Sequence, residues 1–314
     1  MPRKRQFLLT VLLLVSLLDF GFAFENGDKQ AYVVKFLFTF PDSAIDGLVL
    51  SHPQALAIDG EGHVFVVDTG NSRILKFDAR GNFILSVGSF GWEREEFDRP
   101  LDVTAKTGLD LFIADYNNER IERYDLNLNY ISSFTSVESE RLGFAFPSGI
   151  DISKHGELFI CDNDNDRILK LDTSGNPNSS FGDFNWGDGQ LEDPGKVEVT
   201  KSDLVYVSDQ GTDQVVVFDY YGNFVLRFGK NILRDPDGVF HSFENKLYVA
   251  DSGHHRIVVF NSAHETLHHW GQKGSGFGAF HHPVDVAGFR ERIYVLDSFN
   301  NRIQVFKIIG AKKE

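Results

Sequence analysis

The most informative segment of the chain runs from His52 to Gly88 and reads HPQALAIDGEGHVFVVDTGNSRILKFDARGNFILSVG. It contains four short apolar runs, rich in β-branched and aromatic residues, separated by Gly, Asn and Asp, which favour turns. In none of these runs do apolar residues recur at helical spacing. The segment therefore predicts four short strands joined by turns, the content of one β-propeller blade.

Two landmarks of this segment recur along the chain. An aspartate ends the second apolar run of each unit, and an arginine follows it five residues later in every unit except the fourth, which has Gln214. The aspartates are Asp68, Asp115, Asp162, Asp209, Asp251 and Asp297. A proline opens each unit, at Pro53, Pro100, Pro147, Pro194, Pro236 and Pro283. Because both landmarks recur in step in six units, the sequence predicts an all-β fold, a six-bladed β-propeller of four-stranded antiparallel blades.

The last unit holds only three strands of its own before the chain ends. The apolar run from Val33 to Phe40 matches the fourth strand of the other units, so we expect it to complete the sixth blade and close the ring. The propeller is expected to span residues 24–310, with the closing strand at 32–40 and a tail at 311–314. Blades are expected to start near residues 53, 100, 147, 194, 236 and 283.

The unit from His52 to Gly88 resembles an NHL repeat, through its proline, its Val-x-Asp-Thr-Gly-Asn-x-Arg-Ile core and its closing glycine. The resemblance extends to all six units and implies a six-bladed propeller. NHL propellers include protein-binding platforms, RNA readers, extracellular sensor domains and an amidating-lyase branch, so the resemblance leaves the function open.

The Asp-x-x-Asn-x-Arg core falls where the second strand turns into the third. We expect Asn71 to bond its local backbone and Arg73 to pair with carboxylates between blades. Because the core recurs around the ring, it indicates a structural role. Gln214 is expected to weaken the junction at the fourth unit.

Residues 1–23 have the pattern of a signal peptide. Basic residues at 3–5 precede an apolar run at 6–18, and small residues at 21 and 23 suit cleavage. We therefore predict a secreted or periplasmic, extracytoplasmic protein; an uncleaved anchor is the alternative. No later stretch is apolar and long enough to span a membrane. Cys161 is the only cysteine, so no intramolecular disulfide can form.

The charge balance limits the partners. The formal net charge is −14, and removing the leader makes it about −16 because three basic residues and one aspartate leave. Nucleic acid is an unsuitable partner for such a chain, because its binding depends on a positive field. A protein, peptide or glycan partner is expected, and the chain is expected to be a monomer.

Long connections should carry aromatic residues on one face of the ring. The connections into each first strand, and those between the second and third strands, share a face that we call the loop-rich face; the other turns form the tight-turn face. The aromatic residues on the loop-rich face are Phe90, Trp92, Phe184, Trp186 and Phe277. They are expected to anchor a partner; the alternative is that they fill gaps between blades.

The innermost strands should place charged side chains around the central channel. These residues are Asp102, Asp151, Lys196, Glu198 and Asp285. At the channel mouth they would bind a small polar ligand or a cation. The alternative is a water-filled channel with solvated charges.

Histidines gather in neighbouring blades on the loop-rich face. Four of them, His52, His254, His255 and His282, form an alternative zinc site together with His281. Solvated loop histidines are the other interpretation. No metal or other cofactor is assigned.

The function expected from these features is that of a non-catalytic binding scaffold. The alternative is a metal-dependent enzyme on the channel, with zinc as in the amidating-lyase branch or calcium as in lactonases of related form. The resemblance to that branch implies zinc-binding histidines directly after the repeat prolines, where this chain has none. A Gly-x-Ser-x-Gly nucleophile motif is also absent from the sequence.

Overall fold

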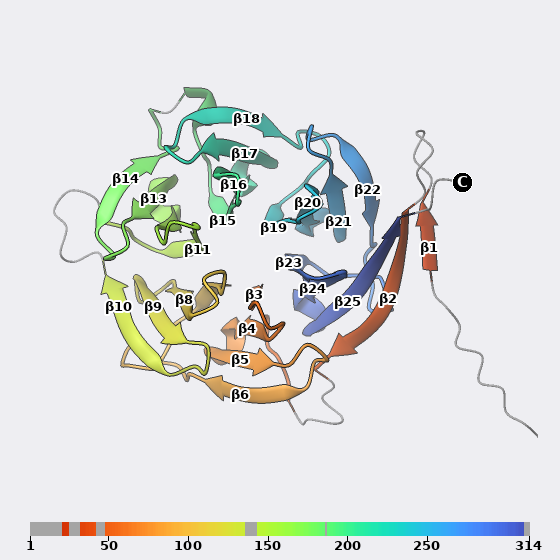
Figure 1. The fold of residues 1–314 in the computed structure, drawn as a ribbon, viewed down its shortest axis with the longest axis horizontal. Helices are drawn as coiled ribbons and strands as arrows, with labels where there is room; N and C mark the ends of the chain where they lie inside the picture. The colour runs from red at the N-terminus through yellow and green to blue at the C-terminus, as the bar shows by residue number, and fades with distance from the viewer. Residues whose placement is uncertain (1–20, 25–31, 42–47, 136–142, 186, 311–314) are drawn as a thin grey trace, which may run out of the picture.

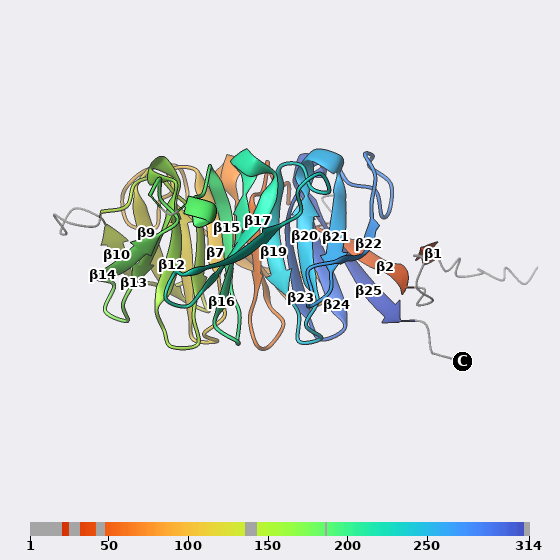
Figure 2. The same cartoon turned by 90° about the horizontal axis from the view of Figure 1, so that it is seen from above.

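The computed structural model describes residues 21–24, 32–41, 48–135, 143–185 and 187–310. These residues form six β-sheets arranged radially about a central axis, as Figure 1 shows, and contain no α-helix. Seen from the side in Figure 2, the ring is a disc with turns and connections on its two faces. The predicted six-bladed propeller is confirmed.

Each of the first five blades is a four-stranded antiparallel sheet whose first strand lies nearest the axis. Short 3-10 turns join the second and third strands in most blades. The strands of these blades are β3 (Ala55–Ile58), β4 (Val64–Asp68), β5 (Arg73–Phe77) and β6 (Phe83–Val87); β7 (Pro100–Thr104), β8 (Asp110–Asp115), β9 (Arg120–Asp125) and β10 (Tyr130–Thr135); β11 (Pro147–Ile152), β12 (Leu158–Asp162), β13 (Arg167–Leu171) and β14 (Pro177–Phe181); β15 (Pro194–Val199), β16 (Leu204–Asp209), β17 (Gln214–Asp219) and β18 (Phe224–Phe228); β19 (Pro236–His241), β20 (Leu247–Asp251), β21 (Arg256–Phe260) and β22 (Thr266–Trp270).

The sixth blade is completed by the N-terminal part of the chain, as predicted. Its own strands are β23 (Pro283–Phe289), β24 (Arg292–Asp297) and β25 (Arg302–Gly310), and β2 (Tyr32–Phe40) pairs antiparallel with β25. Figure 1 shows β2, in red-orange, beside the blue β25. The ring is therefore closed by main-chain hydrogen bonds between the two ends of the propeller.

A fifth strand in this sheet was not predicted. β1 (Gly21–Phe24) pairs antiparallel with β2 at the outer edge of the blade. It overlaps the small residues expected at the cleavage site of the leader. Residues 1–20 of the predicted leader and the predicted tail at 311–314 lie outside the described residues.

The cores of the molecule lie between neighbouring blades. Each of six clusters of buried apolar side chains joins two adjacent sheets. The closing strand contributes to two of them: Phe40 packs against Phe77 of the first blade, with ring centroids 5.2 Å apart, and Val34 is buried against the fifth blade. Closure is thus stabilised by apolar burial as well as by hydrogen bonds.

Cys161 lies in β12 and is fully buried. Burial raises the pKa of its thiol well above the usual value, so the reactive thiolate is disfavoured. Within the described part of the chain, no helix has the length and apolar character needed to cross a membrane.

Candidate functional site

The repeated aspartate and arginine fasten the connection that enters their own unit. The buried carboxylate of Asp68 accepts a hydrogen bond from the Ser51 N–H at 2.6 Å and pairs with Arg73 Nε at 2.8 Å. Asn71 Nδ2 donates to the same carboxylate, at 2.8 Å. Arg73 Nη2 also donates to the carbonyl of Val49, at 3.0 Å. This set of contacts, which we call the staple, fixes the loop-rich face above each blade.

The prediction that the arginine pairs with carboxylates between blades is wrong. The antiparallel register places Arg73 directly opposite Asp68, so the pair forms across one hairpin. The corresponding pairs are Arg120 with Asp115 at 2.9 Å, Arg167 with Asp162 at 2.7 Å, Arg256 with Asp251 at 2.6 Å and Arg302 with Asp297 at 2.8 Å. Five of the six staples therefore share one geometry.

The fourth unit makes its staple differently. Gln214 stands in place of the arginine, and Arg227, from β18, donates to the carbonyls of Asp188 and Gln190 at 2.7 Å. Gln190 lies 24 residues before Gln214, and Val49 lies 24 residues before Arg73, so the two carbonyls are at equivalent positions. Burial raises the pKa of Asp209, the aspartate of this unit, to about 6. Arg227 thus supplies the donor to the connection, from another strand.

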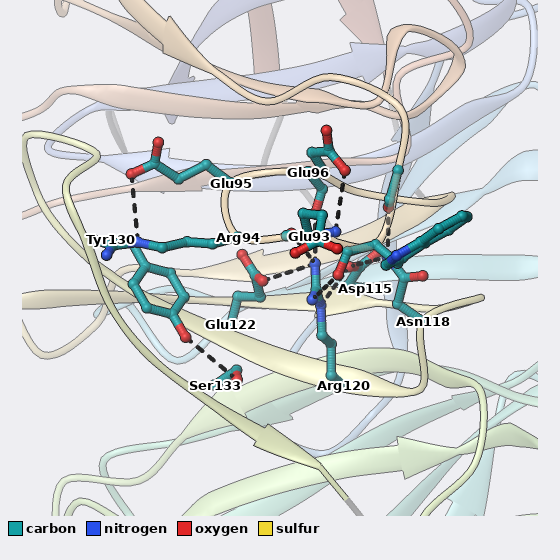
Figure 3. Close-up of polar contacts among 12 residues, drawn as sticks. Glu93, Arg94, Glu95, Glu96, Asp115, Asn118, Arg120, Glu122, Tyr130 and Ser133 are labelled. Carbon is teal, nitrogen blue, oxygen red and sulfur yellow. Dashed lines mark hydrogen bonds and ion pairs between the residues drawn. The ribbon is translucent and has the colours of Figure 1, made fainter.

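The connection that carries Trp92 is held by the staple of the second unit, shown in Figure 3. Arg120 donates to the carbonyl of Trp92 at 2.8 Å and to that of Glu96 at 2.6 Å. Asn118 adds a bond to the carbonyl of Gly91, at 2.9 Å. The backbone around Trp92 is therefore fixed at three points.

A buried glutamate supports the same arginine. Glu122, on β9, lies 2.9 Å from Arg120 Nη2 (Figure 3). It also accepts a hydrogen bond from the Tyr124 hydroxyl at 2.6 Å. Burial raises the pKa of Glu122 to about 7. In the sequence this residue stands out only by its charge, at a position where other units have apolar residues or Gln304.

Most of the predicted aromatic residues are exposed. The exposed fractions are 71% for Phe90, 73% for Trp92, 80% for Phe184 and 57% for Phe277. Phe277 also stacks on Phe36 of the closing strand, with ring centroids 4.5 Å apart. Trp186 lies outside the described residues. For Phe90, Trp92 and Phe184, exposure argues against the alternative that they fill gaps between blades.

The first layer of the channel is built around Lys196. Its Nζ lies 2.6 Å from the carboxylate of Asp102, which also accepts a hydrogen bond from the Ile150 N–H at 2.7 Å. Asp285 accepts a hydrogen bond from the Leu56 N–H at 2.8 Å. Burial raises the pKa of Asp285 to about 7. These contacts join the innermost strands of different blades.

The second layer is built around Lys106. Its Nζ contacts both Asp151 and Glu198, the latter at 2.6 Å. Asp151 also accepts hydrogen bonds from the Thr104 hydroxyl at 2.9 Å and from the Val199 N–H at 2.6 Å. Burial raises the pKa of Glu198 to about 7.

All five predicted channel residues are buried and lie in these two layers, where they bond to groups of other blades. Sequence reasoning missed Lys106, whose long side chain reaches in from the turn after β7, and Asp237, directly after a repeat proline. Burial raises the pKa of Asp237 well above its usual range. The binding of a polar ligand or cation here stays a prediction.

Two of the predicted histidines serve a blade junction. The Nδ1 atom of His255 accepts a hydrogen bond from the N–H of His282 at 3.0 Å. Equivalent junctions use Asp166 and Asn301 as acceptors for the residue before the repeat proline. The pair therefore has a structural function that the sequence pattern did not reveal.

The remaining histidines do not complete a metal site with them. His254 lies 3.0 Å from the carboxylate of Asp251, while His52 and His281 pack edge-on against the ring of Phe299. Among the described residues, no three His, Cys, Asp or Glu side chains are grouped so that they could hold a metal ion.

The comparisons with known proteins support the fold. The family model described as NHL repeat matches residues 50–77, which include β3, β4 and β5. A search of curated proteins gave no match.

Similar solved structures share the architecture at low sequence identity. Virginiamycin B lyase from Staphylococcus aureus is 14% identical, with a TM-score of 0.61, over 91% of this chain and 94% of that one. A gluconolactonase from Xanthomonas campestris is 12% identical, with a TM-score of 0.65, over 88% and 90%. An auxiliary nutrient binding protein from Bacteroides thetaiotaomicron is 13% identical, with a TM-score of 0.65, over 89% and 77%. At such identities the likeness concerns the fold alone.

The matched repeat, the recurrence of its landmarks in six units and the ring of six four-stranded sheets agree with one another. The chain is a six-bladed β-propeller with a match to the NHL repeat at residues 50–77.

Proposed function

We propose that the protein is a non-catalytic, extracytoplasmic scaffold that binds a protein or peptide on its loop-rich face. The observation that carries this proposal is the exposure of Phe90, Trp92 and Phe184 on long connections of that face. Exposure of large aromatic side chains to water is unfavourable, and such side chains are enriched among the residues that dominate protein interfaces.

The connections that carry these residues are held in place. Arg120 fixes the backbone around Trp92, and Arg227 fixes the connection that contains Phe184. The buried Leu191 anchors the latter connection further, through its N–H bond to Gly182 at 2.8 Å. A surface that is already ordered loses little conformational entropy on binding, which favours a role in recognition.

The channel gives less support to the enzymatic alternative. The hydrogen-bonding capacity of Asp102, Asp151 and Lys196 is largely taken up by neighbouring strands. The similar structures include both enzymes and a nutrient-binding protein, so the fold is compatible with either function. A metal-dependent reaction would require these internal contacts to be exchanged for contacts to a metal ion.

The test begins with partners cross-linked to the protein in the extracellular fraction and identified by mass spectrometry. Their affinity is then measured for Trp92→Ala and Phe184→Ala, with Leu109→Ala as control. Leu109 is 74% exposed and lies in a turn of the tight-turn face. Each aromatic substitution should weaken binding by about 30-fold, a typical effect for an interface hot spot.

Unchanged affinity in both aromatic variants would refute the loop-rich face as the binding surface. Elemental analysis of the purified protein tests the alternative function. Stoichiometric zinc or calcium that is lost on Asp102→Asn and Asp285→Asn substitution would favour a metal-dependent enzyme.

A further inference from the structure

A second candidate site lies on the tight-turn face, between the third and fourth blades. A cavity of about 510 Å³ opens there among four consecutive turns. Its main lining residues are His155, Glu157, Asp172, Asp203, Tyr220 and Tyr221. All of these side chains carry hydrogen-bonding groups or aromatic rings, so the cavity differs from the apolar spaces between blades.

The two adjacent tyrosines distinguish the fourth unit from the others. In the turn between β17 and β18, Asp219 accepts the N–H groups of Tyr221 and Asn223, both at 2.9 Å. Asp172 accepts the corresponding N–H groups in the third unit, where Ser174 stands in place of Tyr221. Because the same turn forms without aromatic residues, the turn does not explain them.

The two rings have different roles in the cavity. Tyr220 is an inner wall: Lys170 Nζ lies 3.6 Å from its ring centroid, and His155 packs edge-on at 5.2 Å. Tyr221 stands nearly perpendicular to Tyr220, at an interplanar angle of 87°, and is 81% exposed. The ring of Tyr221 is therefore accessible to a guest.

Two of the three carboxylates in the lining are balanced by lysines of the protein. Glu157 pairs with Lys170 at 2.8 Å and Asp203 with Lys154 at 2.7 Å. The hydrogen bond from Lys154 lowers the pKa of Asp203, which keeps this carboxylate ionised. The paired carboxylates keep further lone pairs as acceptors, but they attract a cationic guest only weakly.

An aromatic platform surrounded by carboxylate acceptors, two of them paired with lysines, matches a polyhydroxylated ring. The C–H groups on one side of a pyranose pack on an aromatic face, and its hydroxyl groups need partners at its edge. Carboxylates accept such hydrogen bonds, and the His155 imidazole, whose Nε2 lies 3.4 Å from Asp203, offers its Nδ1 as a further polar partner. A quaternary ammonium would use the aromatic face but would leave the polar groups without a partner.

We propose that this cavity binds an uncharged pyranose sugar, which stacks on Tyr221 and bonds through its hydroxyl groups to Asp172, Asp203 and His155. The site is independent of the proposed function, because it lies on the opposite face of the ring. The shared chemistry is that of one pyranose unit, either free or at the end of a glycan chain.

The experiment measures binding of methyl glycosides of glucose, galactose, mannose and N-acetylglucosamine by saturation-transfer NMR and calorimetry. At least one glycoside should bind, and Tyr221→Ser should weaken it by about tenfold, the upper range for one aromatic contact. Tyr221→Trp should retain binding. Tyr221→Ser installs the residue of the third unit, so its thermal unfolding should match that of the wild type.

Two further arms separate the sources of the sugar and the two faces of the protein. Tighter binding of a trisaccharide than of its terminal methyl glycoside indicates a glycan chain, and equal binding indicates a single unit; both support the site. Trp92→Ala should leave glycoside binding unchanged, so the two proposals fail independently. Phe243→Ser, an exposed aromatic of the same face, is the matched control and should also have no effect.

Three results would overturn the proposal. The first is that no glycoside in the panel binds, and the second is binding that Tyr221→Ser leaves unchanged. The third is that tetramethylammonium occupies the cavity and the sugars do not, which would identify a cation site instead.

Discussion

The fourth unit and its five counterparts fasten the same connection by different routes. In the other units the arginine comes from the third strand and pairs with the buried aspartate across a hairpin. In the fourth unit it comes from β18 and reaches the carbonyl at the equivalent position, while the Asp209 carboxylate accepts hydrogen bonds from the Thr212 hydroxyl and the Glu192 N–H. The fold thus requires a hydrogen-bond donor beside the carbonyl of the connection, and either the third or the fourth strand of the blade can provide it.

The exchange is visible in the strand register. Arg227 lies opposite Val216, at a position where the first three units have Ser86, Ser133 and Ser180 and the fifth has His269. Arginine occurs there only in the unit that lacks the usual one. The fourth unit therefore departs from the repeat twice, at Gln214 and at Arg227, and the second departure compensates for the first.

The largest effect is expected when a regular unit is given the glutamine of the fourth. Arg167→Gln leaves the fully buried carboxylate of Asp162 without its ion pair, because Ser180 cannot replace the arginine. Loss of one partner of a buried pair costs about 3–5 kcal/mol. Chemical denaturation should show this loss. Adding Ser180→Arg should recover the contact to the connection and part of the stability; no recovery would contradict the compensation.

The pH dependence of stability should differ at the fourth staple. Burial raises the pKa of Asp209 from 3.8 to about 6, so the folded protein holds this proton more tightly than the unfolded chain. This difference contributes up to about 3 kcal/mol to the free energy of unfolding. The contribution is complete below about pH 4 and is lost as the pH rises to about 6. Denaturation of wild type and Asp209→Asn between pH 4 and pH 7 isolates this contribution. Parallel curves would refute it.

Removal of the compensating arginine should have a smaller effect. Arg227→Ala loses three hydrogen bonds to the carbonyls of Asp188 and Gln190, but the side chain is partly solvated. The expected cost is about 1–2 kcal/mol. Arg227→Lys is the control and should retain only part of the stability that Arg227→Ala loses, because an ammonium lacks the planar fork that reaches both carbonyls. Hydrogen exchange should rise first in the connection at 182–193.

The smallest effect is expected when the usual arginine is restored. Gln214→Arg adds a donor beside Asp209, but Arg227 already occupies the carbonyl of Gln190. The gain in the free energy of unfolding should stay below about 1 kcal/mol in the wild-type background. It should be larger when Arg227→Ala is also present. A gain of equal size in both backgrounds would show that the two arginines do not share one function.

The fold could be predicted from sequence because the repeat is long, regular and present six times. The closing strand was predictable too, since Val33–Phe40 has the composition of the strand that the last unit lacks. β1 was not predictable, because four residues next to the apolar run at 6–18 carry no strand signal of their own.

The sites were less predictable because they depend on distances between units. Asp102 and Lys196 belong to different blades, and only their shared position near the axis brings them together. Pairing inside the staple was predictable in principle, since residues five apart across a tight hairpin lie opposite each other. The cavity beside Tyr221 needs two neighbouring blades, so no single segment indicates it.

Ring closure by β2 also sets a constraint on synthesis. This strand is made before the strands of the first five blades, yet its partner β25 is the last strand of the propeller to be made. Until then the edge of β2 stays unpaired, and its apolar side chains lack the neighbours that later bury them. Nascent chains of this protein therefore need protection from edge-to-edge aggregation throughout translation, and a chain that stops before residue 302 cannot close.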